Sequence, residues 1–136
     1  MFADITQTTQ LPRMSLLNRH HPLQLKIAAS PQGKDLVITL DGSLSAGDAV
    51  AAQVELLNLS APCTGRLVLD CTRLTYVASV GIRALLALHR NAAGRAVQVI
   101  LAGVTEPVRH ILEVAGLLKH FTLISSPADL PPASTP

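Results

Sequence analysis

The apolar residues of this chain fall into short runs whose spacing switches repeatedly between the period of a strand and the period of a helix. Leu23, Leu25 and Ile27 alternate with polar residues, as expected of a half-exposed strand. Short continuous apolar runs further along are typical of strands covered on both faces. The predicted strands are residues 23–27, 36–40, 67–69, 97–101 and 121–124. Turn-forming residues between the first two predict that they pair as a hairpin.

Three segments between these strands carry the spacing and the end signals of helices. Ser45 and Thr105 are expected to cap the first and the third helix, because a hydroxyl there can accept a hydrogen bond from a free backbone amide. The second helix starts at about Ser79 and is the best defined. The first helix is expected to bury Ala49, Ala52, Val54, Leu56 and Leu57. The order β-β-α-β-α-β-α-β predicts an α/β fold, a small mixed β-sheet with helices packed against it.

Prolines are concentrated at the two ends of the chain. Two of the nine lie in the first 22 residues and four in the last ten. This distribution predicts a compact domain at 23–126 between an N-terminal extension at 1–22 and a proline-rich C-terminal tail at 127–136. The extension can be flexible or can pack as an extra element, and the sequence leaves both possibilities open.

The composition argues against nucleic acid and membranes as partners. Three residues are aromatic and the net charge of +2 is spread without a basic run, so neither a stacking platform nor a phosphate-tracking surface is indicated. Apolar stretches of about five residues are far shorter than the roughly 20 that a membrane span requires. The chain start does not have the pattern of a secretory signal. Cys63 and Cys71 match no metal or redox spacing, so we expect free thiols in a cytoplasmic protein without metal or cofactor.

A serine at the start of the second helix is the strongest candidate for a functional residue. Asp70 ends a central strand, and a turn over residues 71–78 is expected to carry the chain to Ser79. In open α/β sheets, ligands and partners meet the protein at the carboxyl ends of the strands. From spacing alone, Ser79 either caps its helix or serves as a contact or modification point. A phosphate there would face the positive end of the helix, with Arg83 one turn away.

One stretch around this serine carries a recognisable pattern. It reads Leu67-Val68-Leu69-Asp70, then Leu74-Thr75-Tyr76-Val77-Ala78-Ser79-Val80-Gly81-Ile82-Arg83-Ala84-Leu85-Leu86. Asp41-Gly42-Ser43-Leu44 before the first helix and the apolar positions between Val108 and Phe121 agree with the same pattern. Together these residues resemble the central signature of the STAS domain, over about 100 residues. The resemblance implies a STAS-like fold, which bacterial anti-sigma factor antagonists share with the tails of anion transporters.

The resemblance also implies how such a protein acts. In phosphorylatable members the loop reads Asp-Ser-x-Gly or Ser-Ser-x-Gly, and a partner kinase modifies the serine before x-Gly. Ser79 and Gly81 match, whereas Ala78 replaces the acidic or hydroxyl residue and Ser45 stands where many members carry Asp. The implied function is a non-enzymatic partner switch, in which phosphorylation of Ser79 controls binding to a serine kinase that doubles as an anti-sigma factor, and a phosphatase reverses it. The residues expected to bind the partner are Asp41, Ser43, Ser45, Thr75, Tyr76, Ala78, Ser79, Val80, Gly81 and Arg83.

Two other functions remain open. The chain can instead be an unphosphorylated interaction subunit of a larger transport or signalling assembly, which Ala78 favours a little. An enzyme is a weaker alternative, because residues 77–81 do not have the leading glycine of a nucleophile elbow and no zinc-binding or phosphate-cradling motif occurs in the sequence. Asp70 can serve as a base, although capping a turn is the commoner role of such a residue. No catalytic residue is predicted.

Histidines and arginines complete the set of candidates. His89 falls on the apolar side of its helix and is expected in the core, whereas His110 and His120 are expected at the surface. The arginines expected near the contact turn, facing either an acidic partner or solvent, are Arg73, Arg83 and Arg90.

Overall fold

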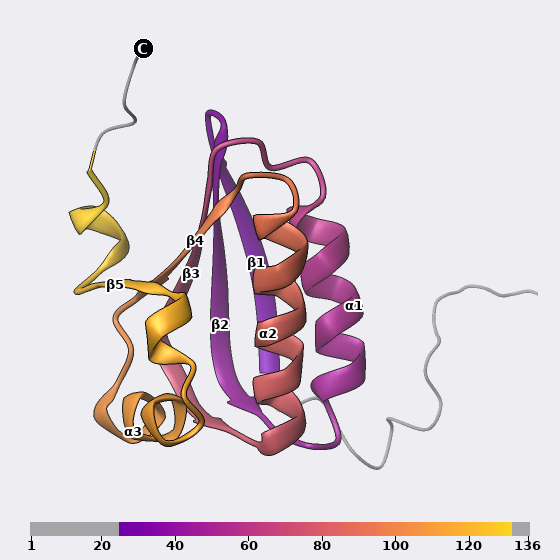
Figure 1. The fold of residues 1–136 in the computed structure, drawn as a ribbon, viewed down its shortest axis with the longest axis vertical. Helices are drawn as coiled ribbons and strands as arrows, with labels where there is room; N and C mark the ends of the chain where they lie inside the picture. Colours follow the sequence, from indigo (N-terminus) through magenta and orange to yellow (C-terminus); the bar gives the residue numbers. More distant parts are fainter. Residues whose placement is uncertain (1–24, 132–136) are drawn as a thin grey trace, which may run out of the picture.

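The computed structural model describes residues 25–131 of the 136-residue chain, so the predicted N-terminal extension at 1–22 lies outside the described residues. The strands are β1 (Leu25–Gln32), β2 (Asp35–Leu44), β3 (Arg66–Val77), β4 (Gln98–Ala102) and β5 (Thr122–Ile124). The helices are α1 (Ala49–Ser60), α2 (Ser79–Ala93) and α3 (Glu106–Val114), with short 3₁₀ turns η2 (Leu118–His120) and η3 (Pro127–Asp129). The predicted order β-β-α-β-α-β-α-β is confirmed (Figure 1). None of the helices between residues 25 and 131 combines the length and the apolar character that crossing a membrane requires.

The five strands form one mixed sheet whose spatial order follows the chain, β1-β2-β3-β4-β5. β1 and β2 pair antiparallel as the predicted hairpin, through a turn in which Gly33 has a φ of 67° that favours glycine. The pairs from β2 to β5 are all parallel, and a helix connects each strand to the next. The carboxyl ends of β2, β3 and β4 therefore lie at one end of the sheet, where α1, α2 and α3 begin (Figure 1).

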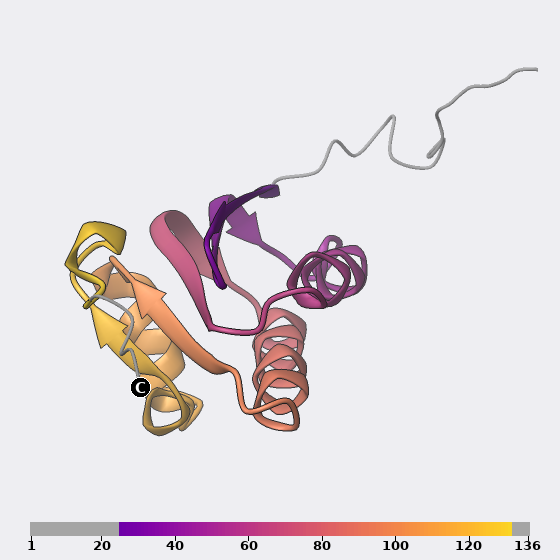
Figure 2. The same cartoon turned by 90° about the horizontal axis from the view of Figure 1, so that it is seen from above.

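All three helices cover the same face of the sheet (Figure 2). Successive side chains of a strand point to opposite faces, so alternate residues of each strand meet the helices. The fully buried residues of this leucine-rich core include Ile38, Leu40, Leu44, Leu56, Leu67, Leu69, Leu74, Leu85, Leu88, Leu101 and Leu112. Val68, Ile100 and Ala102 point the other way and contact Leu130. The central strands are thus buried on both faces, as their apolar runs predicted.

β1 and β2 are longer than the sequence predicted. β1 continues to Gln32, and β2 runs through Asp41 and Gly42 to Leu44. Gly42 has a φ of 126°, which a side chain would disfavour, and the pairing of β2 with β3 shifts register on both sides of this stretch. The turn-forming residues therefore produce an irregularity inside a strand, and the strand ends later.

β3 is also longer, and this changes the approach to the second helix. The turn predicted over residues 71–78 is wrong, because β3 continues to Val77 and only Ala78 separates it from α2. Asp70 accepts hydrogen bonds from the backbone amide and the hydroxyl of Thr72, at 3.1 and 2.8 Å. These bonds lie at the register shift between β2 and β3, beyond which the two strands go on pairing.

The starts of two helices can be compared with the predicted caps. α1 begins at Ala49 with Asp48 as its N-cap, so the prediction that Ser45 caps this helix is wrong. The carbonyl of Ser45 instead accepts a hydrogen bond from the amide of Asp48 at 3.2 Å, in a turn that delays the helix. Thr105 occupies the predicted N-cap position of α3, but the predicted hydrogen bond from a helix amide to its hydroxyl is absent, and the hydroxyl donates to the carbonyl of Leu74 at 3.4 Å instead.

A partly buried ion pair joins the start of β2 to the start of β3. The guanidinium of Arg66 donates to the carboxylate of Asp35 at 2.8 Å, and the backbone amide of Arg66 donates to the same carboxylate at 2.7 Å. The side-chain hydrogen bond from Arg66 is the main reason that the pKa of the Asp35 carboxyl lies below its usual value of 3.8.

Asp35→Ala is expected to lower the free energy of unfolding by about 1–3 kcal/mol, because the backbone amide and the Nη2 of Arg66 lose their acceptor. Asp41→Ala is the control, since Asp41 and Arg73 are 3.7 Å apart and exposed, and such pairs contribute about 1 kcal/mol or less. The depressed pKa means that the Asp35 contribution is present above about pH 4 and is lost as the pH falls through the folded-state pKa. Urea unfolding of the wild type and both variants, at neutral pH and at pH values below about 4, measures the loss of stability and its pH dependence. Equal losses of unfolding free energy in the two variants would contradict a stabilising role of the partly buried pair.

Candidate functional site

Ser79 is the first residue of α2 and is exposed at the carboxyl end of β3. The N-cap position belongs to Ala78, which has an extended backbone and makes no side-chain hydrogen bond to the helix. The Ser79 hydroxyl forms no hydrogen bond with any residue between 25 and 131. Of the two roles that the spacing allowed, capping of α2 therefore does not apply, and the hydroxyl is available to an external molecule.

The start of α2 is held in place by the end of β2. The backbone amide of Ala78 donates to the carbonyl of Leu44 at 2.9 Å, which extends the contact between β2 and β3 up to the helix. Gly81 lies directly against the same residue, because a Cβ added there would be 2.7 Å from Leu44 Cγ and 2.9 Å from its carbonyl oxygen. The glycine of the serine-x-glycine motif is thus required by close packing, and this packing fixes the position of Ser79.

Gly81→Ala is expected to destabilise the fold by about 1–3 kcal/mol, because the added methyl group overpacks a region that includes a backbone carbonyl. This cost opposes the gain of up to about 1 kcal/mol that alanine brings to a helix. Gly47→Ala is the matched control, since an added Cβ at Gly47 meets nothing within 4 Å. Urea unfolding compares the two variants, and a Gly81→Ala protein as stable as the Gly47→Ala protein would contradict the packing argument.

The electrostatic environment of Ser79 is positive. The first backbone amides of a helix have no acceptors within it, and the aligned peptide dipoles add roughly half a positive charge at this end. The first turn of α2 contains no acidic residue. Arg83, one turn further on, is exposed and forms no ion pair with the residues that the structure describes. Both features would stabilise an anionic group on the Ser79 oxygen.

The ends of β2 and β3 bring further predicted residues to the same end of the molecule. Ser43 pairs with Tyr76 across the two strands, and Tyr76 is 50% exposed. The Thr75 hydroxyl donates to the carbonyl of Gly42 at 2.9 Å. Ser45 follows directly after β2 and is partly exposed. Ser43 and Ser45 thus lie near Tyr76 and the first turn of α2, although more than 30 positions separate them in the sequence.

The three predicted arginines do not form one cluster. Arg73 lies 3.7 Å from Asp41, with both side chains exposed. Arg83 is one turn from Ser79, whereas Arg90 is eleven residues along α2, or about 16 Å along the helix axis. The prediction is therefore wrong for Arg90, because a helix carries it away from the turn where it was expected.

The groups considered for catalysis do not reach Ser79. Asp70 accepts two hydrogen bonds from a neighbouring threonine. β3 continues for seven residues beyond it, to Val77, so Asp70 is roughly 20 Å from the end of the strand. His89 packs against the rings of His120 and Phe121, each with a centroid distance of 5.3 Å, as expected of a residue on the apolar side of its helix.

The two cysteines, Cys63 and Cys71, are buried free thiols. Burial raises the pKa of the Cys71 thiol to about 12, so this thiol stays protonated at neutral pH and is a poor nucleophile. Between residues 25 and 131, no three side chains of the metal-ligating kinds converge on a common point.

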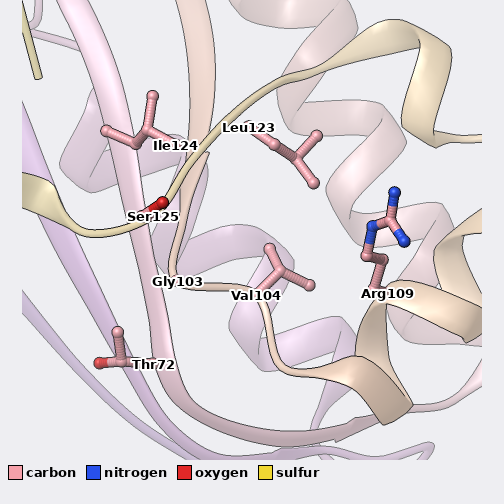
Figure 3. A pocket seen from close by; sticks show the side chains of 7 residues that line it. All are labelled: Thr72, Gly103, Val104, Arg109, Leu123, Ile124 and Ser125. Atoms are coloured by element: carbon pink, nitrogen blue, oxygen red, sulfur yellow. The ribbon is translucent and has the colours of Figure 1, made fainter. Parts of the chain in front are cut away.

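A hollow beside the ends of β4 and β5 was not anticipated from the sequence. It has a volume of about 580 Å³ and opens next to the exposed residue Arg109 (Figure 3). Its lining residues are Thr72, Gly103, Val104, Arg109, Leu123, Ile124 and Ser125. The signal that could have indicated it is the glycine directly after β4: Gly103 has a φ of 69°, and Thr72 leaves no room there for a side chain.

Comparison with known proteins places this geometry in a family. The family model of the STAS domain matches residues 26–130. The anti-sigma factor antagonist SpoIIAA in its unphosphorylated form is 18% identical, with a TM-score of 0.66 over 76% of this chain and 91% of that one. An anti-sigma factor antagonist from Mycobacterium paratuberculosis is 20% identical, with a TM-score of 0.66 over 77% of this chain and 89% of that one.

A sulfate transporter family protein from Wolinella succinogenes shares the fold as well. It is 15% identical, with a TM-score of 0.61 over 70% of this chain and 80% of that one. No curated protein sequence matches the chain. At these identities the solved structures show a shared fold, while the family model covers most of the sequence. The chain therefore belongs to the STAS domain family.

Proposed function

We propose that this STAS protein is a non-enzymatic partner switch whose binding surface, at the N-terminal end of α2, is controlled by reversible phosphorylation of Ser79. The observation that supports the proposal is an exposed hydroxyl at the first position of α2, without an intramolecular partner among residues 25–131. Arg83 and the helix end supply positive charge beside it. The surrounding surface comes from the ends of β2 and β3, where Ser43 and Tyr76 pair.

The partners are a serine kinase that doubles as an anti-sigma factor, and a phosphatase. The kinase transfers the γ-phosphoryl group of ATP to the Ser79 oxygen: the new O–P bond forms as the bond to ADP breaks, and ADP leaves. Ala78 supplies no carboxylate beside the acceptor, so the base that takes the hydroxyl proton belongs to the kinase. The phosphatase hydrolyses the phosphoserine and returns the hydroxyl. We also propose that the protein acts in the cytoplasm, where the free thiols of Cys63 and Cys71 stay reduced.

Incubation of the full chain with the cognate kinase and ATP tests the proposed site. We expect phosphoryl label on the wild type and none on Ser79→Ala. Ser125→Ala is the matched control, because Ser125 is also an exposed serine but lies after β5. Undiminished label on the Ser79→Ala protein would contradict the proposal that Ser79 is the phosphorylated residue.

The alternative is an interaction subunit of a larger transport or signalling assembly that is not controlled by phosphorylation. Ala78 favours it, because this residue stands where phosphorylatable members carry an acidic or hydroxyl residue. In that case Ser79→Asp would leave partner binding unchanged in a pull-down, whereas the switch predicts a loss of binding.

A further inference from the structure

Two exposed valines form an apolar stripe on α1. Val50 is 77% and Val54 is 54% exposed, and they lie one helical turn apart. The sequence pattern predicted that Val54 belongs to the buried face of this helix, and this prediction is wrong. Among the described residues, the exposed large apolar side chains are Val50, Val54, Tyr76, Val114 and Leu123. Of these five, Val50 and Val54 are the two that lie on the same helix.

The stripe lies on the side of α1 that turns toward α2. Ala51 and Glu55 line a small hollow together with residues of β1, so their flank of α1 faces the edge of the sheet. Val50 and Val54 each precede one of these residues, and are therefore displaced by about 100° around the helix axis. This displacement carries the valines away from β1, toward the side on which α1 packs against α2 (Figure 2).

The neighbouring exposed side of α2 is basic. Arg83 and Arg90 are exposed and seven residues apart, so they lie on one side of the helix. Neither forms an ion pair with the residues that the structure describes, and α2 contains no acidic residue. α1 and α2 run in the same direction, because each follows a strand of the parallel part of the sheet (Figure 1). Val54 lies five residues from the start of α1 and Arg83 four from the start of α2, so each is roughly 6–8 Å along its helix.

We propose that Val50, Val54, Arg83 and Arg90, here called the α1–α2 surface, dock an acidic amphipathic helix of a protein partner. Apolar side chains three or four residues apart on such a helix would cover the two valines, whose own spacing is one turn. Aspartate or glutamate side chains of the same helix would meet the two arginines, which have no acidic neighbour on α2.

The charges argue against two other occupants. A second copy docked through the same surface would bring the arginines of both copies together, because a two-fold interface uses the same patch twice. The second candidate occupant is the N-terminal segment of this chain, but residues 1–24 contain a single acidic residue, Asp4, against Arg13 and Arg19. An acidic segment of another protein is the occupant that complements Arg83 and Arg90.

This inference rests on the proposed function and adds the chemistry of the partner. Ser79 and Arg83 lie one turn apart on α2. A phosphate on Ser79 would therefore stand beside the acidic groups of the docked helix and repel them, while it competes with them for Arg83.

Photocrosslinking from single positions of the full chain, in cells that naturally produce it, tests the α1–α2 surface. p-Benzoylphenylalanine replaces Val54 in one variant, Tyr76 in a second and Val114 in a control. Val114 is a matched control, because it is a valine that is 75% exposed but lies on α3. We expect adducts from Val54 and Tyr76 but not from Val114. The peptide joined to Val54 should have apolar residues three or four positions apart, flanked by Asp or Glu.

Charge reversal supplies the second arm of the experiment. Arg83→Glu with Arg90→Glu is expected to reduce the Val54 adduct by about tenfold or more, whereas Arg109→Glu on α3 leaves it unchanged. An adduct from Tyr76 with none from Val54 would overturn the docking surface and leave the switch at Ser79 standing. Adducts from neither position would count against both. A Val54 adduct with a second copy, or with a basic segment, would overturn the inference.

Discussion

Phosphorylated protein is expected to bind the partner kinase about a hundredfold more weakly than unmodified protein. A phosphoryl group on Ser79 adds about 1.5 to 2 negative charges at neutral pH to a surface that now carries the positive helix end and Arg83. If the added charge costs about 3 kcal/mol at the interface, the affinity falls by about two orders of magnitude. The fold itself is expected to tolerate the group, because Ser79 is exposed and the helix end favours an anion.

Titration calorimetry with the purified kinase measures this effect on protein that carries phosphoserine at position 79. Protein with phosphoserine at position 125 is the control, because Ser125 is also exposed but follows the edge strand β5, which β4 separates from β3. Ser79→Asp should give a smaller loss, since it adds one charge instead of two. Unchanged affinity of the protein modified at Ser79 would argue for the unregulated interaction subunit.

Leu44→Ala is expected to cost about 2–5 kcal/mol of stability and to loosen the serine turn. Leu44 is fully buried, its side chain contacts Gly81, and its carbonyl accepts the hydrogen bond from Ala78. Truncation leaves a cavity under the first turn of α2, so the melting temperature should fall by at least about 8 °C. Amide hydrogen exchange at residues 78–82 should also become faster.

Val114→Ala provides the comparison for this variant, because Val114 is exposed and its truncation creates no cavity. Thermal unfolding and hydrogen exchange are measured on both proteins. If Leu44→Ala melted within about 2 °C of the control, the claim that β2 holds the start of α2 in place would fail.

The fold was predictable because its strands and helices differ in period and follow one another regularly. The element order followed from the five predicted strands, residues 23–27, 36–40, 67–69, 97–101 and 121–124, and from the three helical segments between the later ones. The end of β2 was not predictable, because Asp41-Gly42 is a turn-forming pair whose extended conformation depends on pairing between β2 and β3, which no local pattern reveals. The end of β3 could have been found, because Thr72, Thr75, Tyr76 and Val77 are residues of strand-forming types.

The candidate site was predictable only in part. The motif around Ser79 and Gly81 was visible in the sequence, but the reason for the glycine lies in Leu44, which is 37 positions earlier. The exposed Val54 was assigned to the core because α1 has apolar residues on nearly all sides, so its periodicity does not indicate which side is buried. Only the packing of α1 against α2 and β1 settles the orientation of that helix.

The central claim, that cells modify the exposed hydroxyl of Ser79, is tested most directly by intact-mass measurement of the full-length protein taken from the cells that produce it. The account predicts two populations that differ by the mass of one phosphoryl group, with fragmentation mapping the group to Ser79. A single unmodified population under all growth conditions, or a phosphoryl group on another residue, would contradict it.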